Sequence, residues 1–283
     1  MRRRNHVPGH ADTGTAPLNT PRLAAAGTLY VVAVPLSHPD DLTIRAARIL
    51  ESVEIIASED PRATQALLAH HRLARPAAAP ITSYHHDNRD EKTALLLDQL
   101  KSGHSVALVT DCGTPAIYDP GAFLVRAAAA GGIPVTPIPG PSALTAAVSV
   151  SGLEGDRIRF VGRLPATHAP RSRLLRELSG TVETLVIFLD PPHIRQQLAD
   201  LGRYLGPRQA CLCRNLGAAE EHLSYATLKD LDIRQGAASP ATCWTIVIEG
   251  ARSQSKTGRR AAGTPGPRST RYSSSDRRRI TTR

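Results

Sequence analysis

The chain has 283 residues and a net charge of +10, and 41% of its residues are apolar, which is enough to build a normal buried core. This length fits one large domain or two medium ones, and we expect two. No apolar run approaches the roughly 18 residues of a membrane span, and no apolar stretch follows the basic start Met1-Arg2-Arg3-Arg4 as it would in a signal peptide. We therefore expect a cytoplasmic protein without a membrane segment.

The positive charge is concentrated at the two ends of the chain. Residues 1–25 hold four arginines and one aspartate, residues 251–283 hold ten basic residues and one aspartate, and residues 26–250 carry a net charge of −2. Both ends are rich in Gly, Pro, Ser and Thr, a composition typical of disordered arms. The arms either attract RNA phosphates without specificity or are simply solvated, and the sequence does not decide between the two.

The four cysteines, Cys112, Cys211, Cys213 and Cys243, show no C-x-x-C spacing. We expect neither a metal site nor a disulfide, and interpret all four as small buried apolar residues.

Apolar strands alternate with amphipathic helices over residues 26–154, the expected N-terminal α/β domain. We predict strands at 27–34, 54–57, 81–84, 105–109 and 134–138, and helices at 42–50, 61–71, 90–101 and 122–130. Leu95, Leu96, Leu97 and Leu100 of the third helix are expected to face the core. This alternation predicts a parallel sheet with right-handed crossovers, so that the carboxyl ends of the strands share one edge.

The pattern changes after residue 154, which indicates a second α/β domain over residues 155–250. We predict strands at 158–162, 184–189, 210–214 and 243–249, with helices at 171–178 and 193–205.

Turn residues follow three strands of the first domain, where open α/β sheets bind ligands. The longest of these segments, 107–121, breaks from a strand into a loop containing Asp111, Gly113, Thr114 and Pro115. Alone, this loop could be an ordinary Asx-turn. The domain has no G-x-G-x-x-G and no Walker A lysine, which disfavours a Rossmann dinucleotide site and a P-loop NTPase.

Four ordered motifs resemble those of a known family. They are Gly27-Thr28-Leu29-Tyr30-Val31-Val32-Ala33-Val34-Pro35-Leu36, Ser58-Glu59-Asp60-Pro61-Arg62, Asp111-Cys112-Gly113-Thr114-Pro115-Ala116-Ile117-Tyr118-Asp119-Pro120-Gly121 and Pro137-Ile138-Pro139-Gly140-Pro141-Ser142-Ala143. Together they resemble the ribosomal RNA small subunit methyltransferase I family of 16S rRNA cytidine 2′-O-methyltransferases, in the tetrapyrrole methylase superfamily, over roughly residues 27–250.

The resemblance implies a class III methyltransferase fold, in which S-adenosylmethionine binds in a cleft between two α/β domains. It also implies a homodimer that methylates the ribose 2′-hydroxyl of a cytidine in the decoding centre of 16S rRNA, within the small ribosomal subunit. The cofactor-binding residues it implies are Pro35, Leu36, Asp111, Gly113, Thr114, Pro115, Ile117, Ser142 and Ala143. A zwitterionic methionine moiety needs backbone N–H groups and an acceptor for its ammonium group, which strand-end loops and Asp111 can supply.

Glu59 and Arg62 are the catalytic candidates. Glu59 could act as the base that removes the hydroxyl proton, or could be a helix-start carboxylate paired with Arg62. Arg62 could instead bind an RNA phosphate or a cofactor carboxylate.

The sequence departs from the family pattern in several places. Ser37-His38 stands where the family has Gly-Asn, and Pro61 where it has Thr. In the second half, 189–194 and 213–218 replace motifs in which the family has an arginine and a lysine. Two alternatives therefore stay open: a methylase of tetrapyrroles or another small molecule, and a non-catalytic RNA-binding or ribosome-assembly relative.

Overall fold

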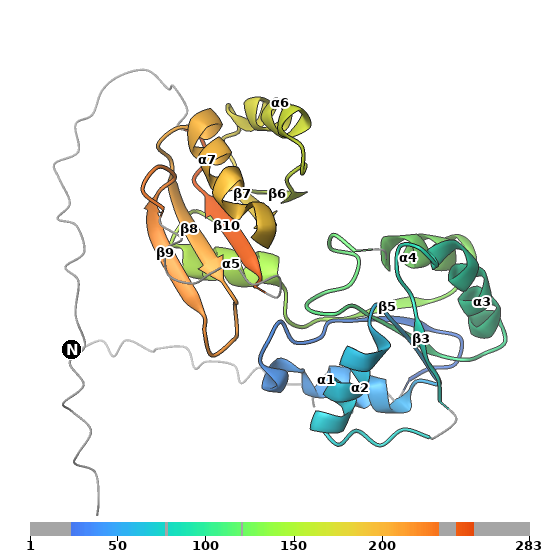
Figure 1. Cartoon of the computed structure of the whole chain (residues 1–283). Coiled ribbons are helices and arrows are strands. Elements are labelled where there is room, and N and C mark those ends of the chain that lie inside the picture. The colour runs from blue at the N-terminus through green and yellow to red at the C-terminus, as the bar shows by residue number, and fades with distance from the viewer. Residues whose placement is uncertain (1–23, 77–78, 120, 232–241, 252–283) are drawn as a thin grey trace, which may run out of the picture. The chain divides into compact units, whose positions relative to one another are not determined.

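The computed structural model describes residues 24–76, 79–119, 121–231 and 242–251, and Figure 1 shows them. The predicted disordered arms fall outside these residues, apart from positions 24, 25 and 251. The described part contains two five-stranded sheets, as expected for two α/β domains.

The first sheet is parallel throughout, as the alternation of strands and helices predicted. Its strands lie in the order β3-β2-β4-β1-β5. Their bounds are β1 Leu29–Val32, β2 Ile55–Ser58, β3 Ile81–Ser83, β4 Val106–Val109 and β5 Val135–Ile138.

Helices cover both faces of this sheet, and the period-2 alternation of its strands explains which residues meet which helices. One face, with Tyr30 and Val109, packs against α1 (Ile44–Ser52) and α2 (Pro61–His70). The opposite face packs against α3 (Arg89–Lys101) and α4 (Gly121–Ala130).

Local capping fixes where the first helices begin. Thr43 caps α1 by accepting a hydrogen bond from the backbone N–H of Ala46, at 3.1 Å. Asp60 caps α2 in the same way, accepting from Arg62 N at 2.8 Å, and Pro61 occupies the first helical position. A short 3-10 helix, η1 (Pro39–Asp41), lies in the loop between β1 and α1.

The second sheet is mixed, in the order β6-β7-β10-β8-β9. Only β6 and β7 are parallel, and the other pairs are antiparallel. The strands are β6 Ile158–Arg163, β7 Thr184–Leu189, β8 Gln209–Arg214, β9 His222–Thr227 and β10 Trp244–Ile248. Helices α6 (His168–Leu178) and α7 (Ile194–Leu205) cover one face, and a 3-10 helix, η2 (Pro191–His193), precedes α7.

Helix α5 (Ala143–Ser151) packs on the other face of the second sheet through Ala147, which meets Val186, Cys211 and Val247. The helix directly follows the last strand-end loop of the first sheet, so it joins that loop to the second sheet. The predicted domain boundary at residues 154 and 155 remains a prediction, and α5 lies on the N-terminal side of it.

Among the α-helices and strands the sequence patterns missed two, and in α3 they misjudged one side chain. Helix α5 and edge strand β9 were not predicted. The expectation that Leu95 faces the core was wrong: it is 51% exposed, whereas Leu96 and Leu100 of the same helix are buried.

Candidate functional site

The loops that follow β1, β4 and β5 are joined by hydrogen bonds at the carboxyl edge of the first sheet. Val34 and Gly113 exchange two backbone hydrogen bonds, with N···O distances of 2.9 and 3.1 Å, which tie the end of β1 to the loop after β4. The Thr114 hydroxyl donates to the carbonyl oxygen of Pro141 at 2.9 Å, which ties the same loop to the one after β5. The three loops therefore form one connected structure around the segment 111–119.

Gly113 is required in this arrangement. Its φ of +79° lies in the left-handed region, and a Cβ there would lie 3.2 Å from Leu36 Cδ2. A side chain at this position would strain the backbone and press on the β1 loop.

The segment 111–119 also holds two non-glycine residues with positive φ, Ala116 and Tyr118, both at 68°. Such residues persist only where their surroundings fix them, and they cluster at binding sites. The Asp119 carboxylate fixes the turn by accepting hydrogen bonds from Ala116 N at 2.7 Å and from Gly121 N at 3.1 Å.

Glu59 lies beside this loop, at the end of β2. Its carboxylate accepts a hydrogen bond from the Thr110 hydroxyl at 2.8 Å. The pairing of Glu59 with Arg62 that the sequence left open is not seen: within the described ranges no ion pair shorter than 4.0 Å joins them.

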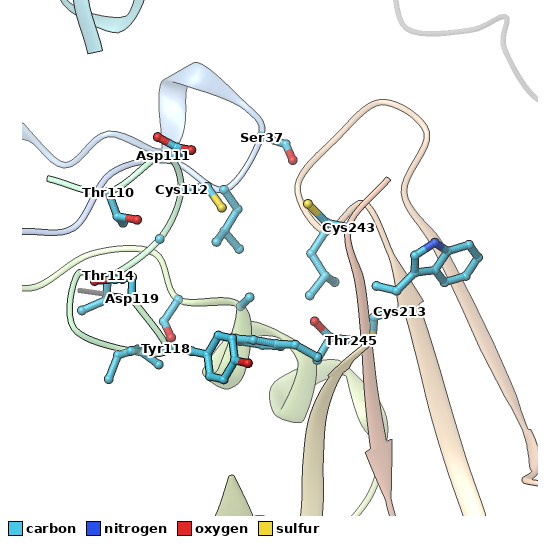
Figure 2. A pocket seen from close by; sticks show the side chains of 18 of the residues that line it. Ser37, Thr110, Asp111, Cys112, Thr114, Tyr118, Asp119, Cys213, Cys243 and Thr245 are labelled. Atoms are coloured by element: carbon cyan, nitrogen blue, oxygen red, sulfur yellow. The ribbon is translucent and has the colours of Figure 1, made fainter. Parts of the chain in front are cut away.

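A cavity of about 350 Å³ opens against these loops. Figure 2 shows Ser37, Thr110, Asp111, Thr114 and Asp119 among the side chains that line it. The second sheet and the loops at its strand ends contribute the rest of the lining: Arg163, Phe188, Leu189, Pro191, Cys213, Leu216, Thr242, Cys243, Trp244 and Thr245. Both sheets belong to the same compact unit of the chain.

The cavity collects most of the residues that the sequence singled out. Those lining it are Leu36, Glu59, Asp111, Gly113, Thr114, Ile117, Ser142 and Ala143. Three others are not in its lining: Pro35 lines a neighbouring cavity, and Pro115 and Arg62 line neither of the two.

Other lining residues gave no signal in the sequence. Arg163 and Trp244 line the cavity although they belong to none of the four motifs, and Tyr118 lines it although it was not among the residues expected to bind the cofactor. The Arg163 guanidinium lies 5.8 Å from the centre of the Tyr118 ring and also forms an ion pair with Asp190. The departures from the family pattern at 189–194 and 213–218 also reach this cavity, through Leu189, Pro191, Cys213 and Leu216.

The interpretation of all four cysteines as buried apolar residues was half right. Cys211 and Cys213 are buried, whereas Cys112 and Cys243 are exposed and line the cavity (Figure 2). Strand-like neighbours around Cys243 suggested burial, but this residue lies just before β10 begins. Across the described ranges, no three His, Cys, Asp or Glu side chains are grouped so that they could hold a metal ion.

Two carboxyl groups in the loop have shifted pKa values. Partial burial, reinforced by the negative charges of Glu59 and Asp60, raises the pKa of Asp111 above that of an ordinary aspartate. Burial also raises the pKa of Asp119, against the opposing effect of its two backbone hydrogen bonds. A cation placed against Asp111 would relieve this repulsion, so the loop favours a positively charged ligand group.

A parallel sheet with a ligand-sized cavity at its carboxyl edge is joined to a mixed second sheet, and most of this chain also matches a family model. The model of the Tetrapyrrole (Corrin/Porphyrin) Methylases covers residues 28–232. The chain therefore belongs to the tetrapyrrole methylase family.

Within that family, the chain is similar to bacterial proteins named Ribosomal RNA small subunit methyltransferase I. The relative from Micromonospora olivasterospora is 40% identical over 211 residues, which are 75% of this chain and 66% of the relative. The relative from Xylella fastidiosa (strain Temecula1) is 43% identical over 210 residues, or 74% of this chain and 76% of the relative. That from Pseudomonas aeruginosa is 40% identical over 208 residues, or 73% and 72%.

Solved structures share the fold at lower identity. Cobalt precorrin-4 methyltransferase matches with a TM-score of 0.58 and 17% identity over 79% of this chain and 95% of that one. Uroporphyrin-III C-methyltransferase from Thermus thermophilus, complexed with S-adenosyl homocysteine, matches with a TM-score of 0.52 and 21% identity over 77% and 96%. At these identities the likeness establishes the fold alone.

Proposed function

We propose that this chain is an S-adenosylmethionine-dependent methyltransferase that modifies the ribose 2′-hydroxyl of a cytidine in 16S rRNA. The observation that carries the proposal is the joining of the three strand-end loops around Asp111 into the wall of one cavity. Similarity of about 40% to several rRNA methyltransferases supports the choice of substrate.

The residues of the cavity fit S-adenosylmethionine. Asp111 offers a carboxylate for the ammonium group of the methionine moiety, and partial burial, together with the nearby charges of Glu59 and Asp60, raises its pKa. Trp244 also lines the cavity, and its buried Nε1–H has no hydrogen-bond partner among the described atoms.

The bound cofactor supplies a methyl group on a sulfonium: the 2′-oxygen bonds to the methyl carbon as the carbon–sulfur bond breaks, and S-adenosylhomocysteine leaves. The protein has to hold the hydroxyl in line and accept its proton. We assign proton acceptance to Glu59, whose carboxylate lines the cavity and is oriented by the Thr110 hydroxyl. In this assignment the cofactor site is shaped by the strand-end loop residues Pro35, Leu36, Gly113, Thr114, Pro115, Ile117, Ser142 and Ala143. Arg62, which is exposed, meets RNA phosphates.

The rRNA assignment is favoured over a tetrapyrrole substrate by the difference in similarity. The rRNA methyltransferases are about 40% identical to this chain, whereas the two solved corrin and porphyrin methyltransferases are 17% and 21% identical. The small ribosomal subunit is therefore the proposed partner.

We further propose that the protein acts in the cytoplasm as a homodimer. Sedimentation of the full chain at twice its 30.3 kDa mass would support the dimer. No helix in the described ranges is long and apolar enough to cross a membrane.

Calorimetry with S-adenosylmethionine, followed by transfer of its labelled methyl group to unmodified small ribosomal subunits, tests the proposal. We expect both binding and transfer. Absence of binding would contradict a methyltransferase of any substrate, whereas binding without transfer would favour the non-catalytic relative.

A further inference from the structure

A second cavity, also of about 350 Å³, lies next to the first. Four residues line both cavities: Leu36, Ser37, Thr110 and Asp111. Ser37, Thr110 and Asp111 are labelled in Figure 2. These four residues therefore form a shared wall between the two cavities.

One face of α2 forms the far wall of the second cavity. Ala63, Ala66 and His70 recur at helical spacing along this face, and the two alanines are exposed. Short side chains on the face leave open space that larger ones would fill. On the same helix, the hydroxyl of Thr64 is buried and bonded to the Ser58 hydroxyl at 2.7 Å, so the wall is anchored to β2.

The lining of the second cavity combines apolar and polar residues. Val34, Pro35 and Leu67 provide flat apolar surface. Hydroxyl and carboxylate groups gather at the shared wall, through Ser37, Thr110 and Asp111, and the half-exposed His70 imidazole also lines the cavity. Such a mixed lining suits a nucleoside, whose base is flat and whose ribose carries hydroxyl groups. The volume of the cavity is near the lower end of the range for small-molecule pockets, about 300 Å³.

We propose that the second cavity binds the nucleoside that is to be methylated, with its base against the α2 face and its ribose at the shared wall. The inference rests on the proposed function, since the first cavity must hold the methyl donor. A target base has to leave its stack to enter such a cavity, as in other enzymes that act on single nucleotides. The ribose then lies beside Thr110 and Asp111, whose hydroxyl and backbone N–H donate to the Glu59 carboxylate at 2.8 and 3.5 Å.

Filling the second cavity tests this inference without touching the first. Ala66→Leu and Ala63→Leu place a larger side chain on the lining face of α2, where leucine is nearly as good a helix former as alanine. We expect kcat/KM for unmodified small ribosomal subunits to fall on the order of 100-fold, because the hydroxyl is displaced from its in-line position. The Kd for S-adenosylmethionine, measured by calorimetry, is expected to stay unchanged.

Ala69→Leu is the matched control, because Ala69 is exposed on the same helix and lines neither cavity. It should keep methyl transfer within about twofold of the wild type, given the small propensity difference. Wild-type transfer rates in Ala66→Leu and Ala63→Leu would overturn this inference and leave the proposed function standing. Loss of S-adenosylmethionine binding in these variants would also overturn it, by assigning the cavity to the cofactor. If the wild-type protein itself neither binds the cofactor nor transfers methyl groups, the proposed function fails instead.

Discussion

Asp111 is the residue on which the proposed cofactor site depends most. Replacing it by asparagine keeps its shape and removes its charge. We expect Asp111→Asn to weaken S-adenosylmethionine binding roughly 10- to 100-fold, the range for one charged hydrogen bond. Calorimetry at pH 7 measures the change, with circular dichroism as the check on folding. Near-normal affinity in a folded variant would remove Asp111 from the site.

The raised pKa of Asp111 predicts how binding and stability depend on pH. The carboxyl group takes up its proton at a higher pH than an ordinary aspartate, so cofactor affinity of the wild type should begin to fall earlier on acidification. Without cofactor, the fold disfavours the ionised form, and Asp111→Asn should raise the free energy of unfolding at pH 7. That gain should shrink as the pH falls through the titration range of the carboxyl group. A gain that persists unchanged at low pH would contradict this explanation.

Asp119 holds the loop in its positive-φ conformation. Asp119→Ala removes the acceptor for Ala116 N and Gly121 N, and we expect a loss of about 1–2 kcal/mol in the free energy of unfolding. Chemical denaturation measures the loss. Asp119→Asn keeps one acceptor oxygen and should lose less; equal stability of the wild type and the alanine variant would mean that the loop does not need this carboxylate.

At the scale of elements, the Thr114 hydroxyl connects the loops after β4 and β5. Thr114→Val removes the hydrogen bond to Pro141 O at almost constant volume. Since such a bond contributes about 1 kcal/mol, we expect roughly fivefold weaker cofactor binding. Thr114→Ser keeps the hydroxyl and should bind normally in the same titration. Equal affinities for the valine and serine variants would show that the connection does not shape the site.

Some elements could be predicted from the sequence because their apolar and capping residues follow directly from burial and helix geometry. The inner strands β1, β2 and β4 of the parallel sheet are largely apolar and buried, and Asp60-Pro61 is a strong helix start. Edge strand β9 has no such pattern: among the described strands it pairs with β8 alone, and its Tyr225 is 59% exposed. Helix α5 is built of small and β-branched residues, and no side-chain hydrogen bond caps its start. Leu95 was misjudged because a run of three leucines cannot all face one side of a helix.

The candidate site also has one part that could be predicted from the sequence and one part that could not. Strand-end loops of the first sheet could be predicted to meet, because parallel topology brings their carboxyl ends to one edge. The lining from Arg163, Leu216 and Trp244 could not, because it depends on how the second sheet folds back onto these loops. Nothing in the local sequence of those residues indicates that they line a cavity.

At the scale of the whole molecule, the basic C-terminal segment bears on RNA affinity. Residues 252–283 carry ten basic side chains and one aspartate, and they lie outside the described residues. We expect their deletion to weaken binding to small ribosomal subunits and to reduce the dependence of log K on log salt, by about 0.7 to 0.9 for each phosphate that the segment neutralises. Cofactor affinity should not change. An unchanged salt slope in the truncated protein would mean that the segment is a passive solvated end.

The central claim is ribose methylation of 16S rRNA, and mass mapping of that RNA tests it most directly. The RNA is compared from cells with the gene, without it, and complemented by the wild type or by Asp111→Asn. We predict that one cytidine in the decoding centre loses a ribose methyl group without the gene, regains it with the wild type and does not regain it with the variant. Identical ribose methylation with and without the gene would contradict the account.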